Sequence, residues 1–205
     1  PGFVFHLAAQ ALVRPSYDDP SATFSTNVMG SVNLLDAVRR CESVRSLVYI
    51  TSDKCYENDE WIWGYRENDQ LGGRDPYSAS KAAAEIVFSS YVRSFFEQCP
   101  SLGTATARAG NVIGGGDWAV DRIIPDCIRA IEKGEPIRLR NPGATRPWQH
   151  VLEPLAGDLL LAVRLYEEPQ SSGGSWNFGP STQEVRTVQT VAEVIIGHLG
   201  KGSIE

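Results

Sequence analysis

The sequence has no long hydrophobic run, since no segment approaches the roughly 18 apolar residues that a membrane-spanning helix requires. Cysteine is also scarce. The cysteines form no C-x-x-C pair and have no histidine at metal-ligand spacing, which argues against a zinc site and against a disulfide framework. They are Cys41, Cys55, Cys99 and Cys127. This usage is typical of a reducing cytosol, so we expect a cytoplasmic protein with no metal site and no membrane partner.

Positive charge is in the minority. The chain has 19 Lys and Arg residues against 25 Asp and Glu residues, which gives a formal net charge of -6. Because affinity for a nucleic-acid backbone depends on clustered positive charge, this balance argues against a nucleic-acid partner, although it allows a local basic pocket. The residues that are present, 42% hydrophobic and 21% charged, have the proportions of an ordinary globular domain.

Two short apolar runs, Phe3–Ala9 and Ser46–Thr51, are predicted to be buried strands. The segment 21–41 between them has apolar residues at helical spacing, namely Val28, Val32, Leu35 and Val38. A strand, a helix and a second strand in this order predict a parallel crossover. The segment therefore reads as half of a doubly wound sheet.

The alternation continues after a polar loop at 57–75. We expect a helix from Pro76 to about residue 98 and a strand at 104–108. Beyond Gly114–Gly116 the pattern predicts short strands near Ile137 and Trp148 and helices at 123–133, 153–166 and 187–199. The sequence thus predicts an α/β fold with a Rossmann-like, doubly wound parallel sheet in residues 1–113. Residues 114–205 are expected to form mainly a partial, smaller α/β lobe that is interleaved with the first domain.

Tyr77 and Lys81 are four residues apart at the start of a predicted helix, so their side chains share one helix face. A phenol with a reference pKa of about 10 is a poor base at neutral pH. A neighbouring ammonium favours the phenolate, and Tyr77 then becomes able to accept a proton from a hydroxyl group. The same spacing also occurs in simple surface pairs, so the motif alone leaves both interpretations open.

Polar residues follow both predicted N-terminal strands. Ser52, Asp53 and Lys54 come directly after the second strand, and the segment His6–Gln10 ends the first. In an open α/β sheet, ligands bind outside the carboxyl ends of the strands. We therefore expect these residues to lie at the edge of the sheet where a ligand would bind.

Several motifs together resemble the extended short-chain dehydrogenase/reductase family, in its order and spacing. They are His6-Leu7-Ala8-Ala9, Asn27-x-x-Gly30-x-x-Asn33, Thr51-Ser52-Asp53, Pro76-Tyr77-x-x-x-Lys81, Arg108–Val112 and Thr145–Val151. The resemblance extends over essentially the whole chain. Within the family, the motifs most resemble those of the CDP-glucose 4,6-dehydratases.

The resemblance implies NAD as cofactor, a nucleotide-diphosphate sugar as substrate, and a homo-oligomer for the full-length protein. It also implies that Ser52 hydrogen-bonds the sugar hydroxyl, Tyr77 takes its proton, and Lys81 binds the nicotinamide ribose and lowers the tyrosine pKa. Hydride would pass from sugar C4 to NAD and return to C6 after loss of water. The further cofactor-binding residues would be Leu7, Ala8, Ala9 and Asn27.

Asp53 and Lys54 would then serve the elimination of water. The resemblance makes Asp53 the acid that protonates the departing C6 hydroxyl and Lys54 the base that removes the C5 proton. Here the sequence departs from the dTDP-glucose dehydratases, which have Asp-Glu at these positions. An ammonium must lose its proton before it can act as a base, which requires burial or a nearby positive charge.

Residues of the second half have two interpretations each. Asn111 is either a ligand of the sugar diphosphate or a turn residue, and Arg146 is either a two-pronged phosphate ligand or a surface arginine. Asn177 lies either at the edge of the substrate site or in a turn. In the polar loop, Trp61 and Trp63 either stack on a base or pack over their own domain.

The family's Gly-x-x-Gly-x-x-Gly turn, which holds the NAD pyrophosphate, does not occur in this sequence, and the first residues have no initiator methionine. We therefore expect a fragment that lacks N- and C-terminal parts and is inactive alone. Three functions compete for the full-length protein: a 4,6-dehydratase, a 4-epimerase or reductase of the same fold, and a non-catalytic relative. Tyr77 and Lys81 disfavour the last, and Asp53 and Lys54 favour the first.

Overall fold

The computed structural model describes residues 1–181 and 184–205, which form two compact units. Unit 1 consists of Pro1–Ala109 and Leu152–Phe178, and unit 2 of Gly110–Val151 and Gly179–Glu205. The chain therefore leaves unit 1 after Ala109 and returns to it at Leu152. In the part that the structure describes, no helix is long and apolar enough to cross a membrane.

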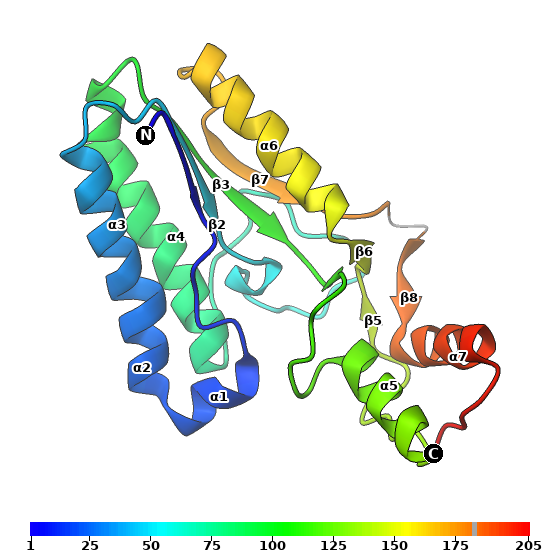
Figure 1. Cartoon of the computed structure of the whole chain (residues 1–205). Helices are drawn as coiled ribbons and strands as arrows, with labels where there is room; N and C mark the ends of the chain where they lie inside the picture. Colours follow the sequence, from blue (N-terminus) through cyan, green and yellow to red (C-terminus); the bar gives the residue numbers. More distant parts are fainter. Residues whose placement is uncertain (182–183) are drawn as a thin grey trace. The chain divides into compact units, whose positions relative to one another are not determined.

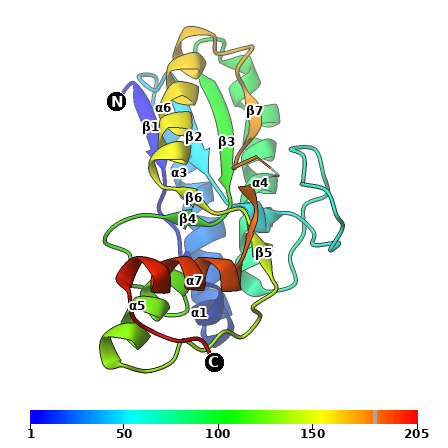
Figure 2. The ribbon, with the colours of Figure 1, turned by 90° about the vertical axis from the view of Figure 1, so that its right-hand side faces the viewer.

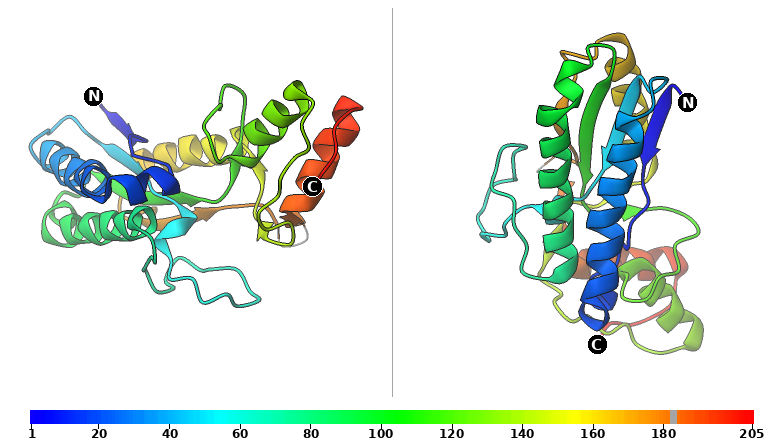
Figure 3. Two further views of the ribbon diagram at one scale, coloured as in Figure 1. Left: turned by 90° about the horizontal axis from the view of Figure 1, so that it is seen from below. Right: turned by 90° about the vertical axis from the view of Figure 1, so that its left-hand side faces the viewer.

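Unit 1 is built on a four-stranded parallel sheet of order β1-β2-β3-β7. Its strands are β1 (Phe3–His6), β2 (Ser46–Ile50), β3 (Gly103–Ala109) and β7 (Gly174–Phe178). Helices α3 (Gly30–Arg39) and α4 (Pro76–Ser94) cover one face, and α6 (Leu152–Glu167) covers the other (Figures 1 and 3). Helices on both faces of a parallel sheet confirm the predicted Rossmann-like α/β fold.

The two faces of the sheet are filled by alternate residues of the strands, because successive side chains of a strand point to opposite sides. Leu47 and Tyr49 of β2 pack with α3 and α4, in a core that includes Leu35 and Phe88. The intervening Val48 packs toward α6 with residues of β3. Burial on both faces explains why β2 is an unbroken apolar run.

Three details of unit 1 differ from the prediction, and a fourth excludes the turn that was one interpretation of Asn177. The helix expected at 21–41 is divided into α2 (Pro20–Phe24), a π-helical turn η1 (Ser25–Met29) and α3. A short helix α1 (Val13–Asp18) was not predicted, and α4 ends at Ser94 and is followed by the 3₁₀ turn η3 (Phe96–Gln98). The segment at Asn177 is strand β7 and not a turn, because it pairs with β3 along its whole length.

Unit 2 contains α5 (Ile123–Lys133) and α7 (Val188–Leu199), which lie side by side in Figure 2 and share a core of Cys127, Ile131, Ile137 and Ala192. Two short strand pairs complete it. The parallel pair is β4 (Val112–Ile113) with β6 (Gln149–His150), and the antiparallel pair is β5 (Thr145–Arg146) with β8 (Arg186–Thr187). The strand expected near Ile137 is a single bridge to Ile204.

Candidate active site

The start of α4 is fixed by local sequence. Asp75 is the N-cap residue, and its carboxylate accepts hydrogen bonds from the backbone N–H of Ser78 at 2.9 Å and from the Ser78 hydroxyl at 2.6 Å. Pro76 occupies the first turn, where its missing N–H has no cost. Gly73 packs so closely that a Cβ there would lie 2.4 Å from the backbone nitrogen of Ala79. These contacts place Tyr77 in a fixed first turn.

Tyr77 and Lys81 are both buried, which excludes a simple surface pair. The backbone N–H of Tyr77 donates to the Ser16 hydroxyl at 3.1 Å, so α1 is tied to the first turn of α4. Lys81 is only 6% exposed. Burial lowers the pKa of Lys81 to about 8, and the nearby Glu85 carboxylate opposes this shift. Lys81 is thus a desolvated cation that titrates near neutral pH.

Asn27 joins three parts of unit 1. Its side-chain oxygen accepts a hydrogen bond from the backbone N–H of Gln10 at 2.8 Å. Its amide nitrogen donates to the Gln10 carbonyl at 3.0 Å and to the Ser80 hydroxyl at 2.8 Å, and Ser80 donates to the Tyr77 carbonyl. Both amide protons of Asn27 are therefore used within the protein, and the residue locks the segment after β1 against α4.

Ser52 lies two residues after the end of β2, as the N-cap of the 3₁₀ turn η2 (Asp53–Cys55). Its hydroxyl donates to the Asp53 carboxylate at 3.1 Å and accepts from the backbone N–H of Lys54 at 3.2 Å. The turn packs against α4, with Cys55 contacting Ala82, the neighbour of Lys81. The structure therefore brings Ser52 and the Tyr77–Lys81 helix together at the carboxyl end of β2.

The remaining predicted residues of unit 1 lie at the same edge of the sheet. Leu7, Ala8 and Ala9 follow β1, and the first two of them are exposed while Ala9 is partly buried. Asp53 is partly buried and Lys54 is exposed. The burial that a lysine base requires is thus not provided by unit 1 itself.

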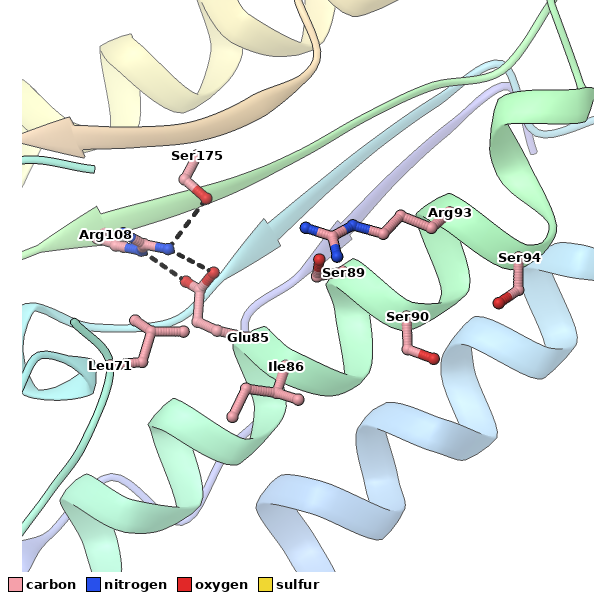
Figure 4. A pocket seen from close by; sticks show the side chains of 9 residues that line it. All are labelled: Leu71, Glu85, Ile86, Ser89, Ser90, Arg93, Ser94, Arg108 and Ser175. Carbon is pink, nitrogen blue, oxygen red and sulfur yellow. Dashed lines mark hydrogen bonds and ion pairs between the residues drawn. The ribbon is translucent and has the colours of Figure 1, made fainter. Parts of the chain in front are cut away.

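A buried charge pair beside this site was not predicted. Arg108 of β3 donates to both carboxylate oxygens of Glu85 on α4, each at 2.8 Å, and each side chain is only 3% exposed (Figure 4). Ser175 of β7 accepts a further bond from Arg108 at 2.9 Å. The pair forms part of a cavity of about 530 Å³ that is lined by Leu71, Glu85, Ile86, Ser89, Ser90, Arg93, Ser94, Arg108 and Ser175.

The polar loop after η2 is anchored on this pair. Tyr56 accepts a hydrogen bond from Arg108 at 2.7 Å and donates to the Asn177 side chain at 2.7 Å. Its ring stacks on Tyr65 at a centroid distance of 5.1 Å, and Tyr65 contacts Trp61. The Asn177 side chain also donates to the Tyr65 carbonyl at 3.1 Å. Its hydrogen bonds to Tyr56 and Tyr65 therefore attach the loop to β7.

The two predicted substrate ligands belong to unit 2. The Asn111 carbonyl accepts from the backbone N–H of Gln149 at 3.0 Å, beside the β4–β6 pair. Arg146 is exposed on β5, and its guanidinium donates to the Thr145 carbonyl at 2.7 Å.

Among the described residues, no group of three or more His, Cys, Asp or Glu side chains is arranged to hold a metal ion. His6 stacks on Tyr49 at 4.9 Å.

The parallel sheet with helices on both faces defines a Rossmann-like α/β protein, with polar residues gathered at the carboxyl edge of the sheet. Comparison with known proteins narrows this class. The profile of the NAD dependent epimerase/dehydratase family matches residues 1–179, and the chain belongs to that family. This confirms the resemblance seen in the motifs.

Curated relatives include dehydratases. The chain is 52% identical over 200 residues to the CDP-glucose 4,6-dehydratase of Salmonella typhimurium, which is 96% of this chain and 56% of the relative. It is 32% identical over 165 residues to a dTDP-glucose 4,6-dehydratase of Streptomyces griseus, which is 78% of this chain and 46% of the relative. The chain thus spans about half the length of these relatives.

Solved structures show the same fold. The UDP-glucuronic acid 4-epimerase of Bacillus cereus, in complex with UDP-glucuronic acid and NAD, has a TM-score of 0.85 at 18% identity, over 99% of this chain and 61% of that one. The UDP-glucose 4-epimerase of Thermus thermophilus, in complex with NAD, has a TM-score of 0.78 at 27% identity, over 100% of this chain and 64% of that one.

Proposed function

We propose that the full-length protein is an NAD-dependent nucleotide-sugar 4,6-dehydratase that converts CDP-glucose to CDP-4-keto-6-deoxyglucose. The observation that carries this proposal is the buried Tyr77–Lys81 pair, on a helix that packs against the turn after Ser52, together with the 52% identity to a CDP-glucose 4,6-dehydratase. The exposed residues Leu7 and Ala8 after β1 and the Lys81 ammonium fit a nicotinamide nucleotide. NAD, when bound, supplies the hydride acceptor and donor.

In this proposal the residues of unit 1 move protons. Ser52 hydrogen-bonds the C4 hydroxyl of the sugar, and Tyr77 accepts its proton as a phenolate. Lys81 stabilises the phenolate by its charge and binds the ribose of the cofactor. Asn27 has a positioning role, since its hydrogen bonds hold the segment after β1 and the first turn of α4 together.

The elimination step is assigned to the next two residues. Asp53 protonates the leaving C6 hydroxyl, and Lys54 removes the C5 proton. Lys54 is exposed in the structure, so in this proposal the bound sugar supplies the burial that favours its neutral form. Asn111 and Arg146 are proposed to contact the sugar diphosphate, where a guanidinium matches the phosphate oxygens.

The test uses the protein expressed from its complete gene. With CDP-glucose and NAD, we expect a 4-keto-6-deoxy product with solvent deuterium at C5. Lys54→Met should still reduce bound NAD on addition of substrate but should release little product and incorporate no deuterium at C5. An inverted hexose from the wild type would identify a 4-epimerase instead, and normal dehydration by Lys54→Met would remove Lys54 from the base role.

Tyr77→Phe tests the first step separately. General acid-base groups contribute about a hundredfold or more to turnover, so we expect a loss of at least that size with similar substrate affinity. Turnover within tenfold of the wild type would mean that Tyr77 is not the base.

Arg146→Ala should weaken binding of the nucleotide diphosphate. Its turnover at saturating substrate should be less affected than its binding.

A further inference from the structure

Glu85 lies one helical turn beyond Lys81. The two residues are four apart on α4, so their Cβ atoms are about 5–6 Å apart on one face of the helix. Both side chains are buried. An ion pair between them would therefore be expected, because an opposite charge at this spacing in a desolvated site attracts strongly. The structure shows a different arrangement.

The Glu85 carboxylate accepts four hydrogen bonds from other residues. One oxygen accepts from Arg108 Nε at 2.8 Å and from the Thr51 hydroxyl, and the other accepts from Arg108 Nη2 at 2.8 Å and from the Thr106 hydroxyl at 3.0 Å. A carboxylate has about four acceptor positions, so these four donors use them all. Glu85 is held in place and has no acceptor left for Lys81.

The charge of Glu85 still acts on Lys81. Burial lowers the pKa of Lys81 to about 8, and the groups that oppose this shift are Glu85 and Cys55. Burial also raises the pKa of Cys55 to about 12, so Cys55 is a neutral thiol at neutral pH. Glu85 is the one of the two that is charged.

Other titratable groups lie on the elements that pack around Lys81, but only Glu85 and Cys55 are among the causes that raise its pKa. Tyr77 precedes Lys81 on α4, and Asp53 belongs to the turn η2 that packs against this helix. His6 of β1 has a lowered pKa, first because of burial and second because of Lys81, so it is neutral near pH 7. Arg108 of β3 is paired with Glu85.

We propose that Glu85 is a positioning residue for Lys81: its carboxylate, fixed by Arg108, keeps the ammonium protonated without capturing it in an ion pair. Lys81 thus remains charged and free to act on Tyr77. The inference rests on the proposed function, in which Lys81 acts as a cation beside Tyr77. Its consequence is that loss of the Glu85 charge makes Lys81 lose its proton at lower pH.

The kinetic test measures the pH dependence of NAD reduction by substrate in the protein expressed from its complete gene. In Glu85→Gln, the alkaline limb should move down by about one pH unit, because a nearby carboxylate that favours the charged form of Lys81 is lost. Activity at pH 8 should fall about tenfold relative to that at pH 6.5. Glu85→Asp, which keeps the charge, should restore the position of this limb.

Thr106→Val is the matched structural control. It removes one donor from the Glu85 carboxylate and leaves every charge in place. It should lower thermal stability and leave the alkaline limb unmoved. Equal shifts in Glu85→Gln, Glu85→Asp and Thr106→Val would show that the limb reports general loosening of the site, and would overturn the proposal.

A direct titration separates this inference from the proposed function. Lysine labelled with ¹³C at Cε is followed by NMR against pH, and the Lys81 signal is assigned by its loss in Lys81→Arg. The Lys81 midpoint should fall in Glu85→Gln even if no nucleotide sugar reduces NAD. If this variant does not fold, Glu85→Gln combined with Arg108→Met removes both charges and should show a smaller fall, because loss of the Arg108 cation partly offsets loss of the carboxylate. An unchanged midpoint in the folded variant would overturn the proposal.

Discussion

Strand β3 has two unlike surfaces. On the side of α6, Ala105 and Ala107 pack with Leu161, Ala162 and Leu165 in an apolar layer. On the side of α4, Thr106 and Arg108 bond to Glu85, and both groups of the ion pair are almost fully buried. The apolar face depends on shape alone, whereas the other depends on every polar atom having a partner. The proposed catalytic helix is on the second face.

The largest effect on this contrast is expected from Arg108→Met. It removes the cation and leaves the Glu85 carboxylate buried and unpaired, which costs about 3–5 kcal/mol. Urea unfolding should show this loss. Glu85→Gln combined with Arg108→Met should be more stable than Arg108→Met alone, because no charge is then left buried. A double variant as unstable as the single one would mean that shape, and not charge, controls this face.

Leu165→Ala examines the apolar face. Leu165 is fully buried against β3, and truncation of a buried leucine costs about 2–5 kcal/mol through lost burial and the remaining cavity. Stability to urea should fall accordingly. In the protein expressed from its complete gene, the pH dependence of turnover should stay that of the wild type. A shifted profile would show that the two faces are not independent.

One residue of α6 breaks the apolar pattern. Asp158 is 7% exposed and lies on the buried stripe of the helix with Leu161 and Leu165, and its Oδ1 atom has no hydrogen-bond partner among the described residues. Burial raises the pKa of Asp158 to about 6. The folded state therefore holds this proton more tightly than the unfolded chain, whose value is about 3.9.

The sign of the pH effect follows from this difference. The Asp158 contribution to stability is fully present below about pH 4 and is lost as the pH rises to about 6, and the loss is roughly 2–3 kcal/mol. Asp158→Asn should remove this part of the pH dependence and raise stability at pH 7. Unfolding free energies measured from pH 4 to pH 7 would test it, and parallel curves for both proteins would contradict it.

Thr106→Val is expected to have the smallest effect. The valine has the same shape, and the loss is one hydroxyl that bonds to Glu85 at 3.0 Å and to Ser175 at 2.9 Å. A buried hydrogen bond contributes about 1 kcal/mol, so the decrease in unfolding free energy should be of that size. No measurable change would mean that Arg108 and Thr51 are sufficient to hold the carboxylate.

The sequence predicted the elements whose pattern is local. The parallel crossover between β1 and β2, helix α5 and the Tyr77–Lys81 spacing all depend on neighbouring residues, and the structure contains them. Strand β7 could not be found this way, since its pairing with β3 joins residues about seventy positions apart. Periodicity also misplaced one surface: Asn27 and Ser31 are buried where Val28 and Val32 were expected.

The Glu85–Arg108 pair was missed because charged residues are usually placed at the surface. A signal for it existed. The run Thr104-Ala-Thr-Ala-Arg108 alternates polar and small residues in a strand that is buried on both sides, so one whole face of β3 required polar partners. Glu85, on the face of the helix that contains Lys81, was the nearest candidate.

The π-helical turn at Ser25–Met29 has a consequence for how the family's sequences can vary. A π-turn contains one residue more than an α-turn, and each helical residue turns the chain by about 100°. Deleting one residue here would let α2 and α3 merge into a regular helix and rotate Asn27 away from Ser80. Point substitutions around this turn should therefore be tolerated more often than a change of length. The length of the turn, and not only its residues, keeps the segment after β1 attached to α4.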